Sequence, residues 1–165
     1  MQLNGSCHCG SVRFSVVGTQ PYPFNLCYCS ICRKTAGGGG YAINLGADFH
    51  TLDVEGDDCI GIYQARIRQQ DARDSEISPA RRHFCTRCGS ALWVWDPRWP
   101  ELIHPFASAI DTDLPLPPVR THMMLNSKPA WVVVCADTSD AHFDGYPSES
   151  LAEWHERHGL AVGDG

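Results

Sequence analysis

Seven of the nine cysteines in this sequence fall into three short groups whose spacing suits metal binding. One group is a C-x-C pair, one holds three cysteines within six residues, and one is a C-x-x-C pair; their members are Cys7 and Cys9, then Cys27, Cys29 and Cys32, then Cys85 and Cys88. Zn²⁺ takes about four ligands in a tetrahedron, so its cysteines arrive as tight local sets from separate segments. The pattern therefore predicts two metal centres.

The three groups divide into four cysteines and three. An extended C-x-C pair places both sulfurs on one face of the backbone, and C-x-x-C followed by Gly89 suits a tight turn. Together these two pairs make a closed set, which is typical of structural zinc. The group from Cys27 to Cys32 leaves a fourth position for water or substrate, which catalysis at a metal requires.

Alternatives remain open for these groups. His8 or a backbone oxygen would close the three-cysteine group into a second structural site. Four thiolates also suit an iron–sulfur cluster. Clustered thiols of low pKa would instead allow redox sensing through Cys27 to Cys32.

Five other features carry weaker signals. Cys59 and Cys135 stand alone in apparent strands, and we expect both to be small buried apolar residues. His122 is expected on the surface or as a satisfied core residue, whereas His83 is a candidate hydrogen-bond partner for a thiolate. The four glycines of residues 37–40 predict a flexible turn, or a place where a substrate approaches the backbone closely.

Length and composition indicate one compact domain over residues 1–165, because the chain is 43% hydrophobic and only 19% charged. The sequence shows no leader and no apolar run long enough to cross a bilayer. We therefore expect a cytoplasmic protein without a membrane partner. In that compartment cysteines persist as thiols, which favours metal binding over disulfides.

The formal net charge of -6 argues against nucleic acid as a partner, because phosphate-backbone binders need clustered Lys and Arg. Two basic pairs nevertheless lie beside the cysteine groups, Arg33 with Lys34 and Arg81 with Arg82. They would offset thiolate charge around a metal, or they are simply solvated surface residues.

The elements that position these groups are mainly β-strands. Residues 11–16 alternate between polar and apolar side chains, and similar β-branched or aromatic runs cover residues 41–45, 59–63, 91–95, 103–106 and 131–135. One helix is predicted after Ser150, which forms a capping box with Glu153, and it ends near Gly159. Residues 115–118 are rich in proline and predict a stiff connector.

Taken together, these motifs resemble the glutathione-dependent formaldehyde-activating enzyme family, which includes the centromere protein V-like domain. The resemblance rests on the segments GSCHCG at 5–10, CYCSICRK at 27–34, FCTRCGS at 84–90 and SKPAW at 127–131. It covers residues 3 to about 135, which leaves an extension with a short helix over about 136–165. The family commonly has His where this chain has Tyr28.

The resemblance implies a β-tent, Mss4-like zinc-binding fold with two zinc ions per chain. It implies a structural zinc on Cys7, Cys9, Cys85 and Cys88, and a catalytic zinc on Cys27, Cys29 and Cys32. The implied activity is that of a carbon–sulfur lyase resembling S-hydroxymethylglutathione synthase, whose partners are a small thiol, glutathione, and an aldehyde, formaldehyde. The alternative function is a non-catalytic, zinc-stabilised module that binds a thiol ligand or a protein partner.

Overall fold

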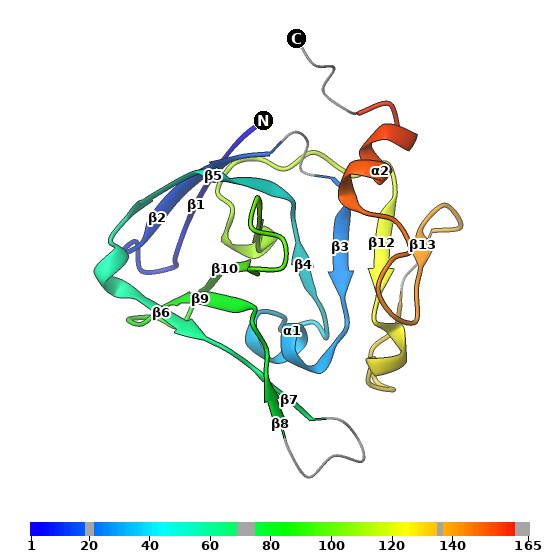
Figure 1. The fold of residues 1–165 in the computed structure, drawn as a ribbon, viewed down its shortest axis with the longest axis horizontal. Coiled ribbons are helices and arrows are strands. Elements are labelled where there is room, and N and C mark those ends of the chain that lie inside the picture. Colours follow the sequence, from blue (N-terminus) through cyan, green and yellow to red (C-terminus); the bar gives the residue numbers. More distant parts are fainter. Residues whose placement is uncertain (19–21, 69–74, 135–136, 161–165) are drawn as a thin grey trace.

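The structure is a computed structural model that describes residues 1–18, 22–68, 75–134 and 137–160. It is mainly β, with a seven-stranded sheet, a four-stranded sheet and a two-stranded hairpin. Figure 1 shows the two larger sheets on either side of the molecule, with a short helix between their lower ends. The strands are β1 (Gln2–Ser6), β2 (Arg13–Val17), β3 (Phe24–Cys27), β4 (Ala42–Asn44), β5 (Ala47–Glu55), β6 (Ile60–Tyr63), β7 (Arg66–Arg68), β8 (Ser75–Ile77), β9 (Arg81–Cys85), β10 (Ala91–Trp95), β11 (Leu102–Pro105), β12 (Arg120–Met123) and β13 (Ala141–His142).

The seven-stranded sheet has the order β1-β2-β5-β11-β10-β9-β6, and its neighbouring strands are antiparallel. Alternation along β2 buries Phe14 and Val16 while their neighbours are more exposed, as expected for a strand with one covered face. These side chains join the main core, which also contains Leu92 and Ile103. Cys7 and Cys85 lie in the same core, so packing in the core brings the first and third cysteine groups together although four strands separate β1 from β9 in the sheet order.

The four-stranded sheet has the order β13-β12-β3-β4. Strand β12 runs parallel to both β3 and β13, and its register places Met123 opposite Cys27. The long connection that a parallel pair needs includes residues 115–118, which form neither strand nor helix, as the prolines predict. Strand β13 shows that the segment after residue 136 contributes to this sheet as well as carrying a helix.

Two α-helices and three short 3-10 helices complete the described structure: α1 (Ser30–Thr35), α2 (Leu151–Arg157), η1 (Asp57–Cys59), η2 (Ala107–Ala109) and η3 (Leu125–Ser127). The predicted capping box of α2 is confirmed, with Ser150 and Glu153 each bonding the other's backbone N–H. Trp154 is buried, and Gly159 follows the helix with a φ of 65°. No helix among the described residues is long and apolar enough to span a membrane.

Most predicted strands are confirmed. Strand β10 has the predicted bounds, and β2, β4, β6 and β11 match their predictions to within about two residues. The prediction for residues 131–135 is wrong for residues 131–134, where Val132 N donates to Pro129 O in a turn at 3.1 Å. Val132 instead packs as a single buried side chain against Gly40. The short helix α1, inside the central cysteine group, was not predicted because it has only six residues.

Candidate metal centres

The first cluster is built from two turns that use the same backbone device. After β1, Gly10 N donates to Cys7 O at 2.9 Å, and after β9, Gly89 N donates to Cys85 O at 2.8 Å. Both glycines are left-handed, with φ of 73° and 76°, a conformation that glycine adopts at little cost. Each turn therefore folds its second cysteine back toward its first.

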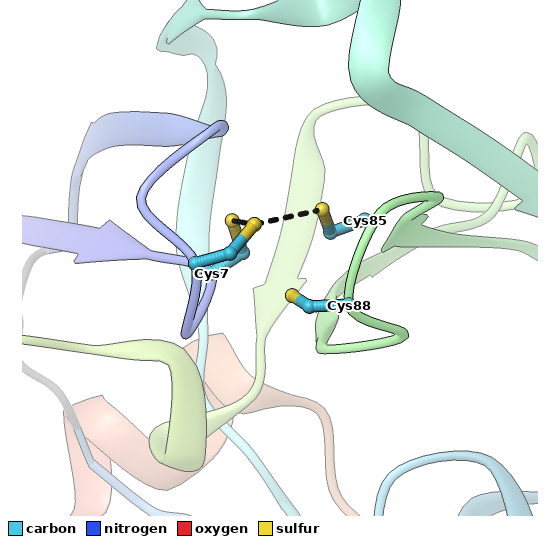
Figure 2. Close-up of side chains that lie close together, drawn as sticks. Cys7, Cys85 and Cys88 are labelled. Carbon is cyan, nitrogen blue, oxygen red and sulfur yellow. Dashed lines mark hydrogen bonds between the residues drawn. The ribbon is translucent and has the colours of Figure 1, made fainter.

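The four sulfurs of this cluster converge. Their Sγ atoms all lie within 4.8 Å of one another, with 3.5 Å between Cys7 and Cys9 and 3.8 Å between Cys9 and Cys85. Figure 2 shows Cys7, Cys85 and Cys88 pointing toward one another from the two turns. A tetrahedral ion about 2.3 Å from each sulfur would separate sulfurs by ~3.8 Å, so these spacings fit a metal.

Burial divides the four thiols into two kinds. Cys7 and Cys85 are buried, and loss of water raises the pKa of Cys85 to about 11. Cys9 and Cys88 are exposed, and the hydroxyl and N–H of Ser90 lower the pKa of Cys88 to about 5. A metal needs deprotonated sulfurs. The pKa of Cys9 is also lowered, so the exposed pair supplies anions readily, whereas Cys85 needs a cation beside it to lose its proton.

The second cluster lies where β3 runs into α1. Cys27 ends the strand, Cys29 caps the helix by accepting a hydrogen bond from Cys32 N at 3.3 Å, and Cys32 is in the first helical turn. Their three Sγ atoms lie within 4.8 Å of one another. No other His, Cys, Asp or Glu of the described segments joins these three cysteines. His8, which the sequence offered as a fourth ligand, is therefore not part of this group.

The electrostatics of the three thiols are unequal. Hydrogen bonds from Cys27 and Cys32 lower the pKa of Cys29 to about 2. The hydrogen bond between Cys27 and Cys29, together with burial, raises the pKa of Cys27. The pKa of Cys32 is lowered by its hydrogen bond with Cys27 and raised by its hydrogen bond with Cys29 and by burial. The pKa of Cys32 is about 11, although the positive charge of nearby Arg82 also lowers it. The negative charge therefore lies on Cys29, and a cation beside the cluster would be needed for Cys27 and Cys32 to lose their protons.

Tyr28 anchors the second cluster from behind. Its ring is 1% exposed, and its hydroxyl lies 2.9 Å from Nδ1 of His122, which is equally buried. Nε2 of His122 lies 3.3 Å from Oδ2 of Asp140. Burial lowers the pKa of His122, so the ring is neutral, with Nε2–H donating to Asp140 and Nδ1 accepting from Tyr28. Of the two positions expected for His122, on the surface or satisfied in the core, the structure shows the second.

Tyr146 was not singled out from the sequence, and the structure places its segment beside Met124, which packs against the apolar cluster of Cys27 and Cys32. Met124 N donates to Gly145 O at 2.8 Å, which carries this tyrosine toward the second cluster. The pKa of Tyr146 is raised, mainly because its hydroxyl is partly removed from water and to a smaller extent because of the charges of Cys27, Cys29 and Cys32. The hydroxyl therefore stays protonated. The side chain is still 69% exposed. Nothing in the spacing of a residue so far along the chain indicated this position.

The remaining candidates lie outside both clusters. Cys59 is buried in the main core, as predicted, although it ends the 3-10 helix η1 and not a strand, and Cys135 lies outside the described residues. His83 stacks on Trp93 with 5.0 Å between ring centroids, and its buried Nδ1 has no partner in the described part of the chain. His83 therefore does not hydrogen-bond a thiolate through Nδ1.

Comparison with known proteins agrees with this arrangement. A family described as glutathione-dependent formaldehyde-activating enzyme matches residues 2–127. A Halomonas elongata protein whose provisional name is glutathione-dependent formaldehyde-activating enzyme is 64% identical over 163 residues, covering 99% of this chain and all of that protein. A crystal structure of a Rhodobacter sphaeroides protein is 27% identical with a TM-score of 0.50, covering 70% of this chain and 92% of that one.

Proposed function

Because the chain belongs to the glutathione-dependent formaldehyde-activating enzyme family, we propose that it is a zinc enzyme that joins glutathione to formaldehyde. In this reaction a carbon–sulfur bond forms, the carbonyl π bond opens, and the thiol proton ends on the new hydroxyl oxygen. The product is S-hydroxymethylglutathione, and the reverse reaction makes the enzyme a carbon–sulfur lyase.

The donor sets support two zinc ions with different roles. Cys7, Cys9, Cys85 and Cys88 offer four convergent sulfurs, which suits a structural ion that ties the turn after β1 to the turn after β9. Together with the mainly β architecture, this supports a β-tent, Mss4-like fold. All eight described cysteines are free, which supports a reducing, cytoplasmic location.

The single observation that carries the proposed activity is the convergence of three sulfurs, from Cys27, Cys29 and Cys32, without a fourth His, Cys, Asp or Glu in the described segments. A zinc ion held there would supply Lewis acidity at its open position, either to a thiol or to a carbonyl oxygen. Cys27 and Cys32 are buried and fix the geometry, whereas Cys29 is partly exposed.

The test compares Cys29→Ser with a control variant, Cys59→Ala. Cys59 is buried and belongs to neither cluster. After reduction and zinc loading, the parent protein and the control are expected to retain both metals and to form S-hydroxymethylglutathione faster than buffer does, as followed by NMR. Cys29→Ser is expected to lose one zinc and at least about 100-fold in rate.

An unchanged rate in Cys29→Ser would contradict the catalytic assignment of this cluster. If the parent protein formed no adduct faster than buffer and held two inert zinc ions, the zinc-stabilised binding module would be the better description.

A further inference from the structure

A polar groove lies beside α1, between the end of that helix and the turn after β9. Its volume is about 370 Å³, and its lining includes Arg33, Lys34, Gly38, Ser90 and Ser108. This volume is within the usual range for small-molecule sites, which is roughly 300–1,000 Å³. The groove is therefore large enough to hold part of a small ligand.

The groove is positive in an otherwise acidic protein. Its lining contains two cations, three hydroxyl side chains and no carboxylate, whereas the whole chain has a formal net charge of -6. Nε of Arg33 is buried and has no hydrogen-bond partner within the described residues, where neither Arg33 nor Lys34 forms an ion pair. Because no carboxylate of the described residues pairs with either charge, an anionic ligand in the groove would do so.

The groove borders both cysteine clusters. Arg33 directly follows Cys32 in α1, and Ser90 Oγ lies 3.2 Å from Sγ of Cys88. Ala36 and Ala91 line the groove and also pack against the apolar cluster that contains Cys27 and Cys32. The groove therefore shares Ala36 and Ala91 with the apolar surroundings of the three-cysteine cluster.

We propose that this groove binds a carboxylate of the thiol substrate, and that Arg33 and Lys34 make the enzyme selective for carboxylate-bearing thiols. This inference rests on the proposed function. The planar guanidinium of Arg33 matches a carboxylate with paired hydrogen bonds, and Lys34 adds a second, mobile charge. Gly38 has open space where a Cβ would be, so a ligand backbone can approach that wall.

The first measurement is selectivity. Formaldehyde is supplied with 3-mercaptopropionate, which carries a carboxylate, or with 2-mercaptoethanol, which is neutral and of similar size. In the double variant Arg33→Gln, Lys34→Gln the ratio of kcat/KM for the two thiols is expected to fall about tenfold. Arg66→Gln, which removes an exposed arginine from β7, is the matched control and is expected to keep the ratio. Zinc content is measured for every variant.

The second measurement separates the groove from the chemistry. It is a calorimetric titration with S-methylglutathione, a compound that retains both carboxylates of glutathione but offers no thiol to a metal. The Kd for this compound is expected to rise about tenfold in the double variant. If no thiol reacts but this binding still depends on Arg33 and Lys34, the proposed function fails and the groove assignment stands. If S-methylglutathione does not bind the parent protein, or if selectivity and Kd are unchanged in the double variant, the groove assignment is overturned.

Discussion

Replacing Tyr28 with Phe tests the buried chain of hydrogen bonds behind the second cluster. The change keeps the aromatic ring, which lies 5.2 Å from the ring of Tyr41, and deletes only the hydroxyl that lies 2.9 Å from His122 Nδ1. Because His122 is 1% exposed, water cannot replace the lost donor without a rearrangement of the core. Nδ1 is then left as a buried acceptor without that partner.

A buried acceptor left without its donor costs about 1–3 kcal/mol of unfolding free energy. For a domain of this size, each kcal/mol lowers Tm by about 2–4 °C, so the expected decrease is about 2–12 °C. Coupling with Asp140→Asn is expected as well, because both changes act on the two nitrogens of one imidazole ring. A double-mutant cycle should therefore depart from additivity by at least about 0.5 kcal/mol.

The assay is urea unfolding of the zinc-loaded proteins, followed by circular dichroism. Tyr41→Phe is the matched control, since the structure shows no hydrogen bond for that hydroxyl within the described residues, and its stability should stay within about 0.5 kcal/mol. If Tyr28→Phe were equally neutral, or if the cycle were additive, the three groups would not form the hydrogen-bonded chain inferred here.

Two further predictions concern pH and backbone packing. Burial lowers the pKa of His104, so the unfolded chain binds more protons than the folded protein, and the free energy of unfolding should fall as pH drops below about 6.5. In urea unfolding at several pH values, His104→Gln should reduce the slope of unfolding free energy against pH. An unchanged slope would count against a buried, neutral His104. A Cβ on Gly37 would lie 2.0 Å from Tyr41 O, whereas Gly38 has open space. Gly37→Ala should therefore cost about 1–3 kcal/mol in urea unfolding while Gly38→Ala stays near neutral, and equal effects would contradict this account.

The local elements were predicted where one short segment contains the whole signal. The capping box of Ser150 and Glu153 lies within a single helical turn, and the apolar run of β10 is bounded on both sides by polar residues. The run at residues 131–134 gave a wrong prediction because Val132 is buried by packing on Gly40 and not by strand pairing, while Trp131 and Val133 are exposed. Local composition cannot distinguish these two reasons for burial.

The sequence by itself determined the two cysteine sets, because metal-ligand spacing is a local property of the backbone and glycine marks the turns. Only the tertiary structure placed Tyr28 against His122 and the segment of Tyr146 beside Met124. It also made a positive groove out of Arg33, Lys34 and Ser90. These groups are brought together by sheet register and by packing between distant segments, and residue spacing along the chain contains no record of such long-range contacts.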